Sequence, residues 1–196
     1  MNKAQRFSRV LLSAVLVTTG AMAAVGGGAA VADGPRVCKG TIGDQEIERN
    51  IVVPAGKTCR LNGTDVDGNV TVRRNATLIA NDADIDGGVR SDGRNARVVI
   101  QRGSDVDDDV RVTRGKRVTV TGSDIGGSIV IARTKLKVAV VNNDVDDDVK
   151  ILNNRGGFQV GRNDIDGNLN CFGNKGPKSG QDNDVDGNKN GQCRNR

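Results

Sequence analysis

Hydrophobic residues along most of this chain are spaced for short β-strands. Within residues 65–83, apolar side chains alternate with polar ones in two short stretches, at Val66, Val70, Val72, Leu78 and Ala80. Alternation with a period of two places these side chains on one face of an extended backbone. Polar, turn-forming residues separate the stretches at 73–76 and end them at 81–82. The pattern therefore predicts two or three short strands whose apolar sides share a core.

The same pattern returns about every 20 residues. A weak copy of the repeat begins at Glu46, and stronger copies, 19 to 21 residues apart, begin at Asp65, Asp84, Asp105, Asp124, Asp144, Asp164 and Asp184. Self-similarity at this period is typical of a solenoid, in which each repeat packs on the next. We therefore predict an all-β fold, a single-stranded parallel β-helix (β-solenoid) of about eight coils of ~20 residues. A strand spacing of about 4.8 Å gives a rod roughly 38 Å long.

Two positions of the repeat predict how the coils turn and stack. The fourth position is Gly in five repeats, but Asp108 and Asp147 in two others. A carboxylate without a partner is too costly in a dry core, so this position is predicted to be a corner. In the last three repeats, the residue just before the repeat is Asn143, Asn163 or Asn183. These three predict a stacked ladder of side-chain amides at a turn.

The first 32 residues have the features of a secretory signal. Three basic residues precede a mainly apolar stretch at 10–25, and small residues stand at Ala30 and Ala32, where a signal peptidase reads the chain. We predict a signal peptide at 1–32 and one β-solenoid domain at 33–196. The alternative is a retained membrane helix, but the stretch lacks a basic stop-transfer flank. No later apolar run is long enough to span a bilayer, so a released protein without a membrane contact is expected.

Removing this segment changes the charge of the chain. The full sequence has 29 Lys plus Arg and 24 Asp plus Glu, and the segment holds three of the basic residues. The remainder has 26 basic and 24 acidic residues, a formal net charge of +2. Bulk charge therefore gives little support for nucleic-acid binding. The chain also has no His, Trp or Tyr, which suits the thin aliphatic core of a solenoid.

Four cysteines stand in two pairs near the ends of the repeat region. Cys38 and Cys59 are 21 residues apart, and Cys171 and Cys193 are 22 apart, close to one coil. Residues one coil apart stack at about the Cα separation that a disulfide requires. We predict disulfides Cys38–Cys59 and Cys171–Cys193, because the other two connectivities would have to span the rod. Metal binding is the alternative, but the export signal implies an oxidising location, and the chain has no His and no CxxC.

The repeat pattern, the terminal cysteines and the leader resemble small secreted bacterial β-solenoid proteins. The likeness covers roughly residues 38–193 and implies a right-handed parallel β-helix. A weaker resemblance is to bactofilins, cytoskeletal β-solenoids that polymerise end to end, from which the leader and the cystine pairs depart. Larger β-helix proteins include pectate lyases and polygalacturonases, so the fold class leaves an enzyme open.

Acidic residues recur at two positions of the repeat. The first column contains Glu46 and the Asp that begins each later repeat; the second contains Asp67, Asp86, Asp107, Asp146, Asp166 and Asp186, with Gly126 in the gap. Stacked like charges repel by about 1 kcal/mol per neighbour in water. One relief is Ca²⁺, which takes carboxylate oxygens. The candidate calcium ligands are Asp105, Asp107, Asp124, Asp144 and Asp146, with Asp105–Asp124 and Asp124–Asp144 as sharing pairs. The alternative is that each Asp caps its own turn while nearby Arg and Lys balance the charge.

A basic ridge follows the second strand of the repeat. Its members are Arg73, Arg74, Arg94, Arg97, Arg114, Lys116, Arg117, Arg133, Lys135, Lys137 and Arg155. Such a ridge favours anionic cell-envelope polymers or polysaccharides as partners, or is a solvated face that balances the acidic columns. Aromatic residues for stacking on bases are missing, so nucleic acid is not expected as a partner.

Little in the sequence points to catalysis. Without His there is no imidazole base and no Ser-His-Asp triad, and no catalytic residue is assigned. Asp pairs two residues apart suit a glycosidase, but they recur in almost every repeat and select no site. We therefore expect a secreted, extracellular, non-enzymatic structural or binding module at or near the cell envelope or wall, with calcium as the only candidate cofactor. The alternative is a calcium-dependent polysaccharide-active enzyme, lyase-like or hydrolase-like.

Overall fold

The structure, a computed structural model, describes residues 34–196. The predicted signal peptide, 1–32, lies outside the described residues. Residues 34–196 consist of short strands joined by turns and contain no helix. Accordingly, this part of the chain has no helix that is long and apolar enough to cross a membrane.

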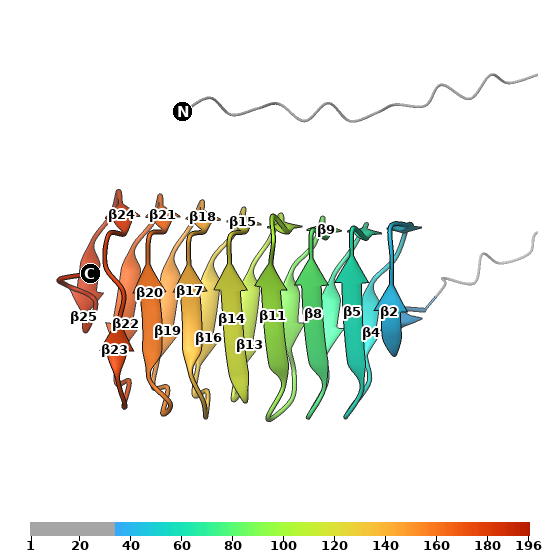
Figure 1. Ribbon diagram of the computed structural model, residues 1–196, viewed down its shortest axis with the longest axis horizontal. Coiled ribbons are helices and arrows are strands. Elements are labelled where there is room, and N and C mark those ends of the chain that lie inside the picture. Colours follow the sequence, from blue (N-terminus) through green and yellow to red (C-terminus); the bar gives the residue numbers. More distant parts are fainter. Residues whose placement is uncertain (1–33) are drawn as a thin grey trace, which may run out of the picture. The chain divides into compact units, whose positions relative to one another are not determined.

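The strands form three parallel sheets, which we call A, B and C, wound around one axis (Figure 1). Sheet A contains β1 (Arg36–Val37), β4 (Ile51–Val53), β7 (Val70–Val72), β10 (Val89–Ser91), β13 (Val110–Thr113), β16 (Ile129–Ala132), β19 (Val149–Leu152), β22 (Leu169–Phe172) and β25 (Lys189–Gly191). Sheet B contains β2 (Gly40–Ile42), β5 (Thr58–Asn62), β8 (Thr77–Asn81), β11 (Arg97–Gln101), β14 (Arg117–Thr121), β17 (Val138–Val141), β20 (Phe158–Gly161) and β23 (Lys178–Ser179). Sheet C contains β3 (Glu46–Ile47), β6 (Asp65–Val66), β9 (Asp84–Ile85), β12 (Asp105–Val106), β15 (Asp124–Ile125), β18 (Asp144–Val145), β21 (Asp164–Ile165) and β24 (Asp184–Val185).

Each coil passes through sheet A, then sheet B, then sheet C, and every strand pairs with its equivalents in the coils before and after. The register is kept along the rod: Val70 pairs with Val89, and Val89 pairs with Val110. Sheet C lies along one edge of the rod, and the turns from sheet A to sheet B lie along the opposite edge (Figure 1). The predicted β-solenoid of about eight coils is confirmed, with three strands per coil.

The core is one continuous aliphatic column inside the three sheets. Val66, Val70, Val72, Leu78 and Ala80, which alternation placed on one face, are all 0 % exposed. Burying a Val or Leu side chain contributes roughly 1.5–3 kcal/mol, so each coil adds a comparable increment. The rod is therefore stabilised coil by coil rather than by one globular centre.

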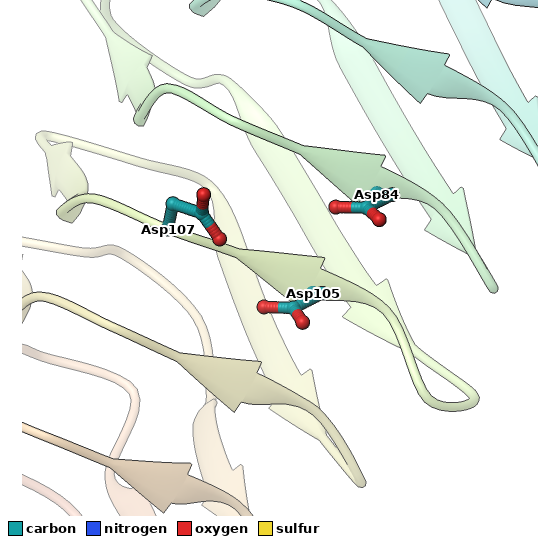
Figure 2. A group of neighbouring side chains, drawn as sticks. All are labelled: Asp84, Asp105 and Asp107. Atoms are coloured by element: carbon teal, nitrogen blue, oxygen red, sulfur yellow. The ribbon is translucent and has the colours of Figure 1, made fainter. Parts of the chain in front are cut away.

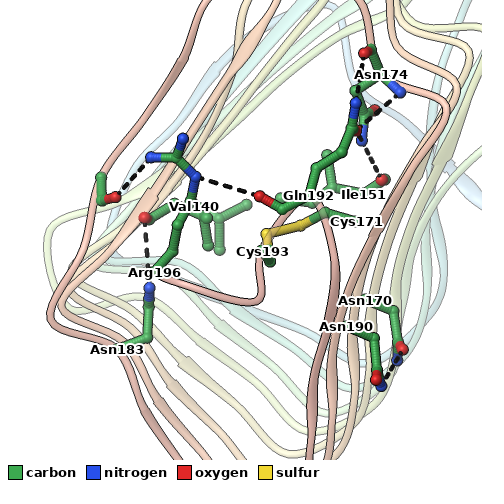
Figure 3. Close-up of a disulfide and its surroundings, with 12 residues drawn as sticks. Val140, Ile151, Asn170, Cys171, Asn174, Asn183, Asn190, Gln192, Cys193 and Arg196 are labelled. Atoms are coloured by element: carbon green, nitrogen blue, oxygen red, sulfur yellow. Dashed lines mark hydrogen bonds between the residues drawn. A yellow bond between two sulfur atoms is a disulfide. The ribbon is translucent and has the colours of Figure 1, made fainter.

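The aliphatic column ends at the C-terminal coil. Phe158 in β20 is 1 % exposed, but its partner one coil later is Lys178, which is exposed. The chain then closes this end with its last residues (Figure 3). Arg196 donates hydrogen bonds to the carbonyl oxygens of Gly180 (3.0 Å) and Gln192 (3.4 Å), and its guanidinium lies 5.9 Å from the centre of the Phe158 ring. This end of the rod is therefore polar, and Arg196 lies over the last large core residue of sheet B.

Each end of the described rod carries one disulfide. Cys38 bonds Cys59 and Cys171 bonds Cys193, with 5.4 Å between the two Cα atoms in both cases. These are the predicted pairs, and none of the four cysteines has a free thiol. Because each bond joins neighbouring coils, it resists fraying of a terminal coil, where a solenoid has a neighbour on only one side.

Two of the three corners pass through left-handed backbone in successive coils. From sheet A to sheet B the residues include Gly56, Asn75, Asn95, Arg114, Arg133, Asn153 and Gly173. From sheet B to sheet C they include Gly63, Asp82, Gly103, Gly122, Asn142, Arg162 and Asp182. Gly, Asn and Asp accept this conformation with the least strain, which explains their recurrence in the turns. The third corner, from sheet C to sheet A, holds the predicted Gly-or-Asp position, including Asp108 and Asp147.

Two ladders of buried amides run along the rod. In the predicted ladder, Nδ2 of Asn143 donates to Oδ1 of Asn163 (2.9 Å), and Nδ2 of Asn163 donates to Oδ1 of Asn183 (2.7 Å). A second ladder, which the sequence analysis missed, starts at Thr134 and continues through Asn154 and Asn174 to Gln192. The side-chain amides also donate hydrogen bonds to backbone carbonyls or accept them from backbone N–H groups. The ladders therefore provide hydrogen-bond partners for buried backbone groups at the corners.

Candidate binding surfaces

The acidic columns of sheet C form one surface, which we call the acidic face. Strand pairing places the first column in register from coil to coil: Asp84 pairs with Asp105, Asp105 with Asp124, and Asp124 with Asp144. Backbone hydrogen bonds continue the ladder past each strand, from N–H of Asp107 to the carbonyl of Ile85 (3.0 Å), so the second column stacks as well. The aliphatic residue between the two columns, such as Val106, points into the core. Alternation therefore turns every carboxylate of both columns outward.

Three carboxylates of this face converge on one point (Figure 2). Asp84 on β9, Asp105 on β12 and Asp107 just after β12 each offer an oxygen, and these oxygens lie within 4.8 Å of one another. Such a group has the donor chemistry of a calcium site. Asp84 and Asp107 are exposed and Asp105 is half-buried. Asp84 and Asp105 also interact with other groups of the protein.

Two predicted calcium ligands, Asp105 and Asp107, therefore belong to this group. Asp124 and Asp144 stack in register with Asp105 as expected, but among the described residues they and Asp146 form no comparable group of three. Asp84 was not among the predicted calcium ligands. Asp84 occupies the same column position as Asp105, one coil earlier. It could have been predicted, because Asp105 pairs with Asp84 on one side just as it pairs with Asp124 on the other.

Repulsion within the acidic face is visible in its pKa shifts. Partial burial, followed by the neighbouring carboxylates of Asp84, Asp67 and Asp86, raises the pKa of Asp65. Burial and then the charges of Asp124 and Asp164 raise the pKa of Asp144 in the same way.

Asp107 has a raised pKa from partial burial and the nearby Asp86. At neutral pH the charged face is therefore held together against its own electrostatic repulsion. A counter-charge, whether an ion or a basic group, would lower that cost.

Asp109 and Asp148 do not belong to the acidic face, although both come from acid-rich repeats. Oδ1 of Asp109 accepts a hydrogen bond from N–H of Ser128 (2.8 Å), and Oδ2 pairs with Arg111 (2.6 Å). Oδ1 of Asp148 accepts from N–H of Asn168 (2.7 Å), and Oδ2 pairs with Lys150 (2.7 Å).

The hydrogen bonds to Ser128 and Arg111 outweigh burial and lower the pKa of Asp109. The hydrogen bond from Lys150, followed by those from Asn168, lowers the pKa of Asp148 to about 2. These two carboxylates form hydrogen bonds between one coil and the next, and they are not candidate ligands for an ion. The repeats that begin at Asp105 and Asp144 each hold four acids, and the corner from sheet C to sheet A divides these acids between two surfaces.

The turns from sheet A to sheet B carry the opposite charge, and we call this edge the basic corner. Two adjoining grooves lie here, of about 870 and 500 Å³. The cations that line them are Arg94, Arg97, Arg114, Lys116, Arg117, Arg133, Lys135, Arg155 and Lys175. No acidic residue lines either groove among residues 34–196. Eight of these nine cations belong to the predicted ridge; Lys175 was missed because the last coils depart from the repeat pattern.

The groove cations have no partners of their own in the described chain. All nine are exposed, and no ion pair or side-chain hydrogen bond joins them to another residue of 34–196. Arg73, also predicted in the ridge, differs because it pairs with Asp92. The basic corner is therefore not neutralised by the acidic face, which lies on the opposite edge of the rod (Figure 1).

No protein-family model matches the chain, and neither the curated proteins nor the solved structures contain a match.

Proposed function

We propose that this protein is a secreted, non-enzymatic structural or binding module that acts at or near the cell envelope. The proposal agrees with the resemblance to small secreted bacterial β-solenoids. It is supported by the two disulfides, which are compatible with an extracellular location because such bonds persist in oxidising compartments. It is also supported by the predicted signal peptide.

The observation that carries the proposal is the separation of charge across a regular rod. Carboxylates repeat along one edge and unpaired cations repeat along the other, both at the spacing of the coils. A repetitive surface suits a repetitive partner, because the same contact can be made again in each coil. Cell-envelope polymers and polysaccharides have that property. Nucleic acid and membrane are not proposed as partners.

Retention without turnover is the test of this proposal. The exported protein is mixed with envelope fractions and with soluble acidic and neutral polysaccharides, and both co-sedimentation and the release of new chain ends are measured. We expect retention on at least one envelope fraction and no change in polymer length. A protein that stays in solution with every fraction would contradict the proposal.

A polysaccharide-active enzyme is the second candidate, and one observation favours it. The carboxylates of Asp84, Asp105 and Asp107 converge, and the raised pKa of Asp107 is a common property of a general acid. Turnover that disappears in Asp105→Asn or Asp146→Asn would establish this candidate in place of the first. Calcium dependence of that turnover would complete it.

A further inference from the structure

We infer that the basic corner binds a linear anionic polymer laid lengthwise along the rod. This inference rests on the proposed function and specifies its ligand by chemical class: an extended chain with one phosphate or carboxylate in each repeating unit. Three features of the basic corner support it: the stacking of the cations, the absence of counter-charges beside them and the shape of the grooves.

The cations stack with the period of the coils. Backbone N–H groups of Lys135, Arg155 and Lys175 each donate to a carbonyl of the preceding coil, at 3.0, 2.9 and 2.7 Å. Together with Lys116, these residues occupy one position in four successive coils. The strand spacing separates them by about 5 Å along the axis. A file of positive charges at that spacing matches an extended polymer with regularly repeated anions.

The file is electrostatically costly without a ligand. Unit charges about 5 Å apart repel one another even in water, and each inner member of the file has two such neighbours. None of the four is paired with an acid of the described chain. A polyanion that lies along the file replaces this repulsion by attraction and releases condensed counter-ions, which makes association salt-dependent.

The two grooves extend this file into a track. They share Lys135, and together their linings run from Asn75 to Lys175 across six successive coils, or about 24 Å of the axis. Uncharged donors and acceptors stand between the cations, at Asn75, Thr77, Asn95 and Asn153. These groups suit the ether or hydroxyl oxygens between the anions of a polymer. No aromatic side chain lines either groove within the described chain, so the track offers no platform for stacking bases.

The test compares two variants of equal charge. The corner variant carries Lys116→Gln, Lys135→Gln, Arg155→Gln and Lys175→Gln. The control variant carries Arg73→Gln, Arg90→Gln, Arg111→Gln and Lys150→Gln, which remove the same charge from sheet A and its margin. Arg73, Arg111 and Lys150 are paired with acids, so the control also shows whether unpaired cations matter more than paired ones.

Binding is measured by isothermal titration with polyphosphate, poly(glycerol phosphate) and oligogalacturonate of graded length, and with neutral dextran. We expect affinity for a phosphate or carboxylate polymer to rise with length until the chain spans about 24 Å. The corner variant should lose at least about tenfold in affinity and show a shallower dependence on salt, because fewer counter-ions are released. The control variant should lose less than about threefold. The better polymer identifies the anion.

Equal losses in the two variants would overturn the inference, since the effect would then follow net charge and not the corner. Binding that is independent of polymer length would overturn it as well. Co-sedimentation tests the proposed function separately. If the corner variant still sediments with envelope fractions, the proposed function stands, but another surface of the module binds and the inference is overturned. If the unaltered protein binds no envelope fraction, the function itself is wrong.

Discussion

At the scale of single residues, the corner between sheets A and B depends on a conformation that most side chains resist. Asn153 has φ 55°, and its N–H donates to the carbonyl of Phe172 at 2.8 Å, so the turn cannot relax without losing a bond between coils. We expect Asn153→Ala to lower the free energy of unfolding by about 1 kcal/mol, because a Cβ without a polar group is strained there. Asn153→Gly should be neutral or slightly stabilising. Urea denaturation measures both; equal losses would show that the amide, not the backbone, matters.

Asp148 allows a test of electrostatics at one residue. Its folded pKa of about 2 lies below the ordinary value of 3.8, because Lys150 and Asn168 stabilise the charged form. The stability from this group is therefore present above the unfolded pKa and is lost as pH falls from about 4 through about 2. We expect Asp148→Asn to reduce stability near pH 7 and to have a much smaller effect near pH 2, in thermal unfolding followed across that range.

Lys150→Gln provides the control for this prediction. The pair joins a partly buried carboxylate to a more exposed amine, with side chains 26 % and 38 % exposed, so its contribution is modest. In the Lys150→Gln background the pH-dependent effect of Asp148→Asn should shrink. An unchanged effect would assign the low pKa to Asn168 instead.

At the scale of elements, the amide ladders hold the corners of successive coils together. Asn163 is 2 % exposed, and it bonds the side chains of Asn143 and Asn183 as well as the carbonyl of Val140. We expect Asn163→Ala to lower the free energy of unfolding by about 2–4 kcal/mol, since it leaves buried groups on two neighbouring coils without partners. Asn170→Ala, which removes one half-buried contact with Asn190, should cost less than about 1 kcal/mol. Similar losses would mean that the ladder is dispensable.

The elements also show what the sequence can and cannot predict. Period-two alternation and the 20-residue repeat correctly identify the core column, the stacking register and both disulfides, because each depends only on which residues recur. They do not show on which side of a corner a residue lies. Asp109 follows Asp107 by two positions, yet the turn between them directs it to sheet A and Arg111. The second amide ladder was missed because it begins at Thr134 and ends at Gln192, so that the repeat shows only Asn154 and Asn174.

The candidate site was predicted in part for the same physical reason. Side chains that converge in a solenoid come from neighbouring coils, so a site is defined by register as much as by sequence. Asp105 and Asp107 were found within one repeat, whereas Asp84 required the pairing partner of Asp105. Lys175 likewise joins the basic corner through its backbone contact with Asn154, not through the repeat pattern.

At the scale of the whole molecule, the rod carries opposite charges on separate edges, so each edge gathers like charges that repel one another. On the acidic face the raised pKa values of Asp65 and Asp144 show a cost that is present when the carboxylates are ionised. Because these folded pKa values are raised, the cost is relieved as pH falls through them and is fully present at neutral pH. Calcium at the acidic face stays a prediction, and it is one way in which that cost would be offset.

Thermal unfolding tests this prediction. A ligand that binds only the folded state raises the melting temperature by mass action. We expect millimolar Ca²⁺ to raise it modestly, and by more than NaCl of equal ionic strength. The sequence alone predicts that Asp124→Asn reduces the rise, whereas the convergence of Asp84, Asp105 and Asp107 predicts a larger reduction for Asp107→Asn. Asp186→Asn, in the last coil of the same column, is the matched control and should leave the rise intact. An unchanged melting temperature, with no heat in a calorimetric titration, would contradict calcium binding. The carboxylates of the acidic face would then be balanced by local hydrogen bonds and nearby basic residues alone.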